Sequence, residues 1–217
     1  MPLPMVHLSV GKNMLDAGFK AKNASLLYPG LISPDAIHMR PNADRHAKKI
    51  THLSSDIVWR ETDLDKLIKY IMNFLNSNKG KADTDFLHGY CIHILTDMYW
   101  VHQVHSKFVV DYSNDTNPVQ DEAGAYYNDT DIVDYILFNE RPWKNDIWES
   151  LQNAEYTDFL DLLSAQEIEA WNKRTLHWYD SNESQHKNPI KYITQADIED
   201  FISSCAKALS NHIHANK

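Results

Sequence analysis

Residues 86–100, FLHGYCIHILTDMYW, are the stretch that decides the predicted fold. They lie in an apolar segment from residue 83 to about residue 110 whose spacing predicts a long helix running through the core. His93 and Asp97 are four residues apart, so their side chains share one helical face, one turn apart. Gly89, one turn before His93, leaves room for another backbone or a ligand to approach.

Two more helices are predicted on either side of this segment. Residues 62–77 place apolar side chains at helical spacing, with Thr62 as the expected N-cap and Asp65 in the first turn. Residues 123–139 form a weaker helical pattern. Both patterns repeat with the period of a helix, which favours an all-helical packing around the central segment.

The C-terminal part of the sequence predicts three further helices. Pro142 suits the first position of a short helix through Leu151, because a helix start needs no N–H there. Ser164 and Glu167 form a capping box for a helix to about Trp178, and the last helix begins at residue 194. Polar segments without period-2 alternation predict the loops, which are 33–56, 112–122 and 180–193.

Length and composition favour one domain. The chain has 217 residues, of which 43% are hydrophobic and 11% aromatic, enough to bury a continuous core. We therefore expect an all-α fold in which residues 1–217 form a single multi-helix domain.

Charge restricts the class of partner. The formal charge of −9 disfavours a stable complex with nucleic acid or an anionic membrane, unless a basic patch or bound metal reverses the local field. Cys91 and Cys205 cannot form a dense disulfide framework, and no apolar run approaches the roughly 20 residues that span a bilayer. Residues 1–15 lack the positive cluster of a secretory signal, so a cytoplasmic protein is expected.

The distribution of the twelve histidines indicates a metal site. An imidazole nitrogen of His93 and a carboxylate oxygen of Asp97 can converge on one ion, and zinc accepts both donor types. An isolated pair at this spacing is more often a plain ion pair, but the polar segment 33–56 offers further ligands, namely Asp35, His38, His46 and His52.

An ordered set of motifs extends this interpretation. It comprises His7 in MVHLSV, Pro34 and Asp35 in GLISPDAIH, Thr51 and His52 in KITHLS, and Phe86, Gly89, His93 and Asp97 in FLHGYCIHILTD. With these motifs the sequence resembles the zinc-dependent phospholipase C / P1 nuclease superfamily, most closely its short bacterial, non-secreted members. The resemblance covers residues 7–105 and implies an all-helical, metal-dependent phosphoesterase.

The resemblance also implies a ligand set. Asp35, His52, His93 and Asp97 would form a first zinc site, with Asp97 able to bridge to a second ion. His7 corresponds to a ligand of another ion, although the family completes that site with a mature N-terminal residue. We expect one or two zinc ions, with another divalent metal as the alternative, and Asp35 as the catalytic residue that orients or deprotonates water.

One further histidine corresponds to a ligand only if the central helix ends or bends. The resemblance places His102 near a ligand of a further zinc ion, but on a straight helix it lies about 140° round from Asp97. His102 and His105 are equally well explained as surface histidines. Other basic side chains that could contact phosphate, or simply be solvated, are His38, His46, Arg40, Arg45, Lys48 and Lys49.

Three functions are consistent with these residues. The first is metal-dependent hydrolysis of a small phosphate ester, either a phosphodiester or a phosphomonoester, by metal-activated water. The second is a non-catalytic helical metal-binding or interaction protein, which a closed coordination sphere would favour. The third, an HD-domain phosphohydrolase, needs an adjacent His-Asp pair, which this sequence lacks.

Overall fold

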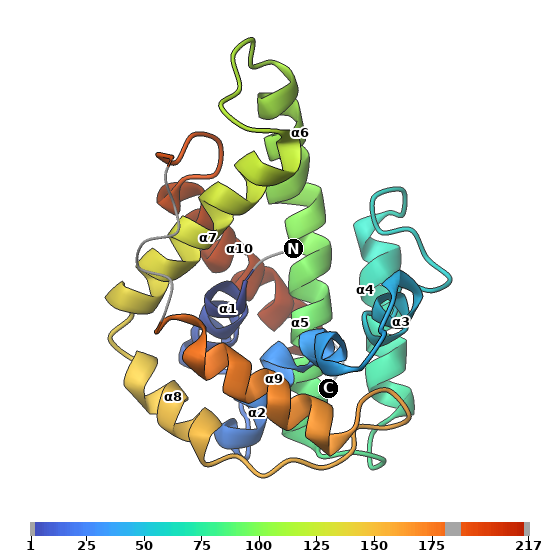
Figure 1. Cartoon of the computed structure of the whole chain (residues 1–217). Helices are drawn as coiled ribbons and strands as arrows, with labels where there is room; N and C mark the ends of the chain where they lie inside the picture. The colour runs from blue at the N-terminus through green and yellow to red at the C-terminus, as the bar shows by residue number, and fades with distance from the viewer. Residues whose placement is uncertain (1–2, 181–187, 215–217) are drawn as a thin grey trace.

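The computed structural model describes residues 3–180 and 188–214, and these are helical with no β-strand among them, as predicted (Figure 1). The elements, in chain order, are α1 (Pro4–Asp16), α2 (Ala24–Ile32), the 3-10 helix η1 (Ser33–Met39), α3 (Arg45–Thr51), α4 (Leu64–Ser77), α5 (Thr84–Trp100), the π-helical turn η2 (Val101–His105), α6 (Ser106–Ser113), α7 (Glu122–Glu140), α8 (Lys144–Gln152), α9 (Ala165–Trp178) and α10 (Gln195–His214).

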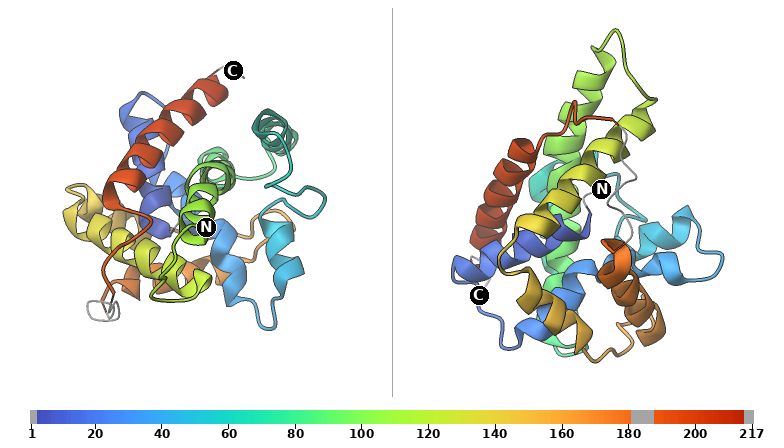
Figure 2. Two further views of the ribbon diagram at one scale, coloured as in Figure 1. Left: turned by 90° about the horizontal axis from the view of Figure 1, so that it is seen from above. Right: turned by 60° about the vertical axis from the view of Figure 1, so that its left-hand side comes forward.

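The predicted central helix is the axis of the fold. α5, η2 and α6 follow one another without a break from Thr84 to Ser113 and form the long green column of Figure 1. Viewed from above in Figure 2, α5 is seen end-on, with α4 on one side and α10 on the other. Asp83 caps the start of α5 by accepting hydrogen bonds from two first-turn amides.

Two glycines let α2 cross α5 at backbone contact. A Cβ atom at Gly89 would lie 2.3 Å from the carbonyl oxygen of Leu27, and one at Gly30 would lie 2.4 Å from that of Phe86. Side chains at these positions would therefore force the helices apart. The room predicted beside Gly89 is filled by the α2 backbone.

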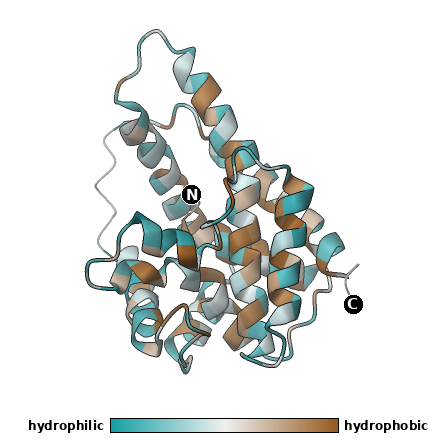
Figure 3. Ribbon diagram, turned by 90° about the vertical axis from the view of Figure 1, so that its right-hand side faces the viewer, coloured by the Kyte–Doolittle hydropathy of each residue, from teal (hydrophilic) through white to brown (hydrophobic). Residues whose placement is uncertain are grey.

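The amphipathic helices are confirmed, with small shifts at their ends. α4 buries the predicted apolar stripe against α5, and the colours of Figure 3 show apolar and polar residues on different sides of the helices. The capping box of Ser164 and Glu167 is present. Asp63, not Thr62, caps α4, and Pro142 precedes α8, which begins at Lys144.

The predicted loop 33–56 is wrong for much of its length. It contains η1 and α3, which pack against each other. Asp44 caps α3 through the amide of Ala47. Of the other predicted loops, 112–122 lies between α6 and α7, whereas 181–187 lies outside the described residues.

Buried carboxylates of α7 fasten three separate segments together. Asp134 accepts hydrogen bonds from the amide of Met5 at 3.0 Å and from the hydroxyl of Tyr179 at 2.5 Å. Asp129 accepts from the amides of Tyr192 at 2.6 Å and Ile193 at 3.0 Å. These bonds hold α1, α9 and the entry to α10 on α7.

Across the described residues, no helix is long and apolar enough to cross a bilayer.

Candidate metal centre

Five of the six predicted metal ligands converge in the interior. His7 comes from α1, Asp35 from η1 and His52 from the residue that ends α3, while His93 and Asp97 come from α5. Segments nearly ninety residues apart in the chain therefore meet at one point. Asp35 is the most exposed of the five, with 16% of its side chain accessible, and the others are buried.

The donor atoms lie at distances that suit one small metal ion. His52 Nε2 lies 3.3 Å from Asp35 Oδ1 and 3.7 Å from Asp97 Oδ2. His93 Nε2 lies 3.6 Å from Asp97 Oδ2 and 3.9 Å from Asp35 Oδ2. Donors placed tetrahedrally at about 2.0–2.2 Å from zinc are about 3.3–3.6 Å from one another, so these four contacts are close to the spacing of zinc ligands.

Helix packing fixes the orientation of the His93 ring. Its Nδ1 lies 2.8 Å from the carbonyl oxygen of Leu31 in α2. Because a carbonyl can only accept a hydrogen bond, Nδ1 carries the hydrogen, and in the neutral ring Nε2 then offers a lone pair toward Asp35 and Asp97. Backbone carbonyls orient metal-binding histidines in the same way. The α2–α5 contact at Gly89 thus positions a ligand.

A backbone carbonyl in the last turn of α3 orients the ring of His52. Its Nδ1 lies 3.0 Å from the carbonyl oxygen of Lys48, one turn earlier in α3, and 3.1 Å from the hydroxyl of Thr51. The Nδ1 hydrogen is donated to the carbonyl, which leaves Nε2 of the neutral ring facing the two carboxylates. The short helix α3, which was not predicted from the sequence, therefore orients His52.

His7 extends the cluster on the other side of Asp97. Its Nε2 lies 3.6 Å from Asp97 Oδ1, and its ring stacks on that of His93 with centroids 3.8 Å apart. His7, His93 and Asp97 each offer one donor atom within 4.8 Å of the others, as do Asp35, His52 and His93. The arrangement has two adjacent donor groups that share His93.

The cluster is rich in buried polar atoms without a hydrogen-bond partner. Leaving such an atom unsatisfied costs about 1–3 kcal/mol, and more for a charged group. In this cluster they are both nitrogens of His7, Nε2 of His52, Nε2 of His93 and both carboxylate oxygens of Asp97. Acceptors and lone pairs that face one another in this way fit a cation as the missing partner.

Burial and charge displace the pKa values of the three imidazoles in different directions. Burial, with His93 alongside, lowers the pKa of His7 to about 3. Burial also lowers the pKa of His52. It acts against the charged form of His93 too, but the neighbouring Asp97 carboxylate outweighs it and raises the pKa of His93. Two of the rings therefore favour the neutral form that binds metal.

The two carboxyl groups are held ionised. Burial acts to raise the pKa of Asp35, but the adjacent imidazoles of His38 and His52 and the charge of Lys48 hold it well below its usual value. Burial likewise opposes ionisation of Asp97, and the adjacent imidazoles lower its pKa. With neutral imidazoles the two carboxylates carry two negative charges, which one divalent cation would balance.

Two basic side chains that were expected to be solvated lie next to Asp35. Lys48 Nζ lies 3.1 Å from Asp35 Oδ1 and 3.1 Å from His38 Nε2, and His38 Nε2 lies 3.6 Å from the same carboxylate oxygen. A solvated loop was the expectation for both. They were missed because η1 and α3, which bring them together, were taken as a loop.

The remaining predicted ligand stands apart. His102 Nε2 lies 2.9 Å from the carbonyl oxygen of Trp59, and neither donor group found in the described residues includes it. The central helix does not end before His102 but passes through η2, and His105 contacts the guanidinium of Arg60. Arg40, a candidate for phosphate contact, pairs with Glu167 at 2.6 Å.

A cavity of about 530 Å³ opens beside the cluster. It is lined by Asp35, His38 and Lys48, by residues of α9, and by residues from the start of α1 and from α7. Its volume lies within the range of about 300–1,000 Å³ typical of ligand pockets. Asp35 belongs to both the cluster and the cavity wall, so a molecule in the cavity would reach the cluster through it.

No family model, curated protein or solved structure matches this chain. The chemistry of the cluster therefore rests on its own geometry.

Proposed function

We propose that this protein is a zinc-dependent hydrolase of small phosphate esters, either monoesters or diesters. The observation that carries the proposal is the convergence of Asp35, His52, His93 and Asp97 at zinc-like spacing, with their orphaned donor atoms facing one another beside a cavity. The nitrogen and oxygen donor set favours zinc over magnesium or calcium, which prefer oxygen ligands alone.

The four side chains would hold the ion, zinc's ability to take a fifth ligand would leave it open to water, and His7 would be available to a second ion at Asp97. When bound, zinc supplies Lewis-acid chemistry, since it lowers the pKa of water toward neutrality and withdraws charge from phosphoryl oxygens. His52 and His93 would bind through Nε2 in the tautomer that their backbone contacts already select. Little reorganisation of these rings is needed before the reaction.

Residues at the cavity wall would carry out the remaining steps. An ionised oxygen of Asp35 accepts a hydrogen bond from the attacking water and takes its proton as the new phosphorus–oxygen bond forms. Lys48 donates a hydrogen bond to a phosphoryl oxygen, and His38 lies beside it to protonate the leaving alcohol as the ester bond breaks. These roles follow from position at the rim, where substrate can reach all three side chains.

Turnover of synthetic esters by zinc-loaded protein tests the proposal. The substrates are 4-nitrophenyl phosphate and its bis-ester, with wild type, Asp35→Asn and the matched control Asp161→Asn, whose side chain is exposed and belongs to neither the cluster nor the cavity lining. We expect zinc-dependent hydrolysis by wild type and the control, and a kcat at least about 10²-fold lower for Asp35→Asn.

Two results would contradict this account in different ways. Zinc-loaded wild type that hydrolyses neither ester faster than zinc in buffer would favour a non-catalytic metal-binding protein. Hydrolysis that survives unchanged in Asp35→Asn would reject Asp35 as the proton acceptor while keeping the metal-dependent reaction.

A further inference from the structure

One side of α9 lines the cavity that Asp35 also lines. Trp171, Arg174, Thr175 and Trp178 all line the cavity. They follow the spacing of three and four residues that brings side chains onto one helical face. This wall therefore belongs to a rigid element and not to a mobile loop.

Arg174 is held above two indole rings. Its guanidinium carbon lies 5.3 Å from the ring centroid of Trp171 and 5.9 Å from that of Trp178. A guanidinium stacks favourably on aromatic faces, and the stacking restricts its side-chain freedom. Within the described part of the chain, no carboxylate is paired with it. Arg174 thus offers a positioned cation whose hydrogen-bond donors are available to a ligand.

Two buried polar atoms beside Arg174 also lack a partner. Thr175 is only 2% exposed, yet its hydroxyl oxygen has no hydrogen-bond partner, and the same holds for Nε1 of Trp171. Buried polar groups without partners are rare, and each is costly unless a ligand or water satisfies it. Both belong to residues that line the cavity, which places two unsatisfied polar groups close to Arg174.

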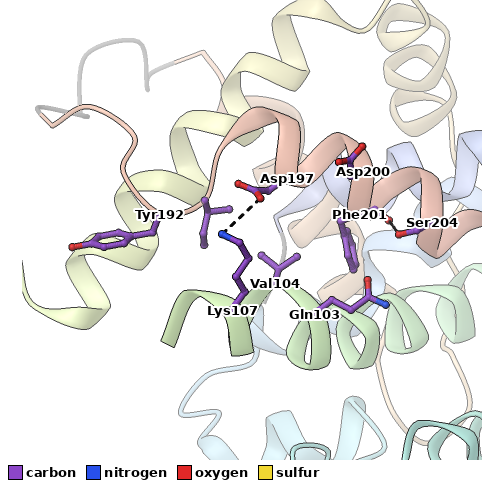
Figure 4. Close-up of a pocket in the computed structure, with 9 residues that line it drawn as sticks. Gln103, Val104, Lys107, Tyr192, Asp197, Asp200, Phe201 and Ser204 are labelled. Atoms are coloured by element: carbon purple, nitrogen blue, oxygen red, sulfur yellow. Dashed lines mark hydrogen bonds and ion pairs between the residues drawn. The ribbon is translucent and has the colours of Figure 1, made fainter. Parts of the chain in front are cut away.

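In two other pockets the lysine side chains are already paired or packed against a ring. In the pocket of Figure 4, about 260 Å³ in volume, Lys107 lies 3.8 Å from Asp197. In the cavity between α8 and α9, Lys173 lies 2.7 Å from Glu169, and Lys144 lies over the ring of Phe138. Lys48, which lines the same cavity as Arg174, is paired with Asp35.

We propose that Arg174 binds a second anionic group of the substrate, so that the site takes a phosphate ester that also carries a carboxylate or a second phosphate. This rests on the proposed function, which places the scissile phosphate at the Asp35 wall. The cavity is far larger than one phosphoryl group, so the Arg174 wall can hold a separate anion. With a net charge of −9, the protein needs such local cations to retain a doubly anionic molecule.

Binding of phosphonates to the zinc-loaded full chain tests this inference without turnover. The probes are a series of ω-phosphonoalkanoates of increasing length, each paired with its neutral ω-amide, measured by calorimetry. For the chain length that spans the cavity, we expect the acid to bind about tenfold more tightly than its amide, the ratio given by one charge-assisted hydrogen bond. A matching bisphosphonate shows whether phosphate replaces carboxylate.

Two variants distinguish a specific contact with Arg174 from a general effect of positive charge. Arg174→Gln is expected to abolish the preference for the acid, whereas Lys173→Gln, the same charge change one residue earlier and outside this cavity, is expected to keep it. A wild type that binds no probe, or acid and amide equally at every length, overturns the inference. So does a preference that survives in Arg174→Gln.

The result is independent of the hydrolysis assay. A preference for acids that depends on Arg174, in a protein that hydrolyses no ester, would reject the hydrolase and keep the anion site. Hydrolysis of esters without any preference for a second anion would keep the hydrolase and reject the anion site.

Discussion

His7 and His93 stack face to face in the interior, with ring centroids 3.8 Å apart and planes 6° from parallel. Two charged imidazoles would repel each other at this distance, so at most one of them is positively charged. Burial assigns the neutral state to His7, whose pKa is lowered to about 3. The stack joins α1 to α5 at the point where Asp97 faces both rings.

His7→Phe separates packing from metal binding at this stack. Phenylalanine keeps an aromatic ring on His93 but has no donor for an ion at Asp97. We expect the variant to remain folded and to bind zinc at least about tenfold more weakly, or with fewer ions per chain. Competition with a chromophoric chelator measures the change. The exposed His46 supplies the control His46→Phe, and equal zinc binding by all three proteins would make His7 a packing residue.

Gly89→Ala tests the contact that positions His93. The new methyl group would lie 2.3 Å from a backbone oxygen of α2 that cannot turn aside. We expect the free energy of unfolding to fall by about 3 kcal/mol, with weaker zinc binding because the bond from His93 to Leu31 is disturbed. Urea denaturation measures the first effect. Gly11→Ala meets only side-chain atoms of Leu31 and should cost less, so a reversed order would contradict this explanation.

Asp134 gives the protein a distinct dependence of stability on pH. Burial raises its pKa to about 7, although the hydrogen bonds from Tyr179 and Met5 oppose the shift. Between the unfolded pKa, near 3.8, and pH 7 the folded state holds a proton that the unfolded state has released. Stability contributed by this group is therefore greatest at low pH and is lost as pH rises toward 7.

Asp134→Asn should remove this dependence while keeping a hydrogen-bond acceptor for Met5. Between pH 5 and the folded pKa of about 7, the free energy of unfolding of the wild type falls by about 1.36 kcal/mol for each pH unit, over about two pH units. Above that pKa the carboxyl group is ionised in both states, so the fall ends. The variant should therefore gain about 3 kcal/mol relative to wild type over this range, measured by urea unfolding at both pH values. A difference that is constant with pH would mean that Asp134 is ionised throughout.

The fold was predictable where helices are amphipathic. The stripes of α4 and α10 and the capping box of α9 are local patterns, and the structure confirms them. α1 and α2 were not predicted because their residues are buried on most sides, which removes the helical period, and α2 contains Pro29 in its interior. α3 is short and mostly exposed, so it has little apolar pattern to detect.

The site was predictable where ligands share a helix or a motif. That His93 and Asp97 share one helical face follows from their spacing, whereas Asp35 and His52 came from the ordered motifs and the resemblance that they support. Metal binding by these four residues stays a prediction. The position of Lys48 was not predictable, because it depends on how α3 packs on η1. His102 was misplaced for a related reason, since a π-helical turn and a contact with the distant Trp59 decide where it points.

Metal content tests the central claim most directly. The wild type, the double variant His93→Ala with Asp97→Ala, and the exposed control pair His46→Ala with Asp161→Ala are purified without chelators, and zinc per folded chain is determined by elemental analysis. The account predicts one or two zinc ions in the wild type and the control and loss of zinc in the double variant. A folded wild type that binds no metal even when zinc is supplied would contradict it.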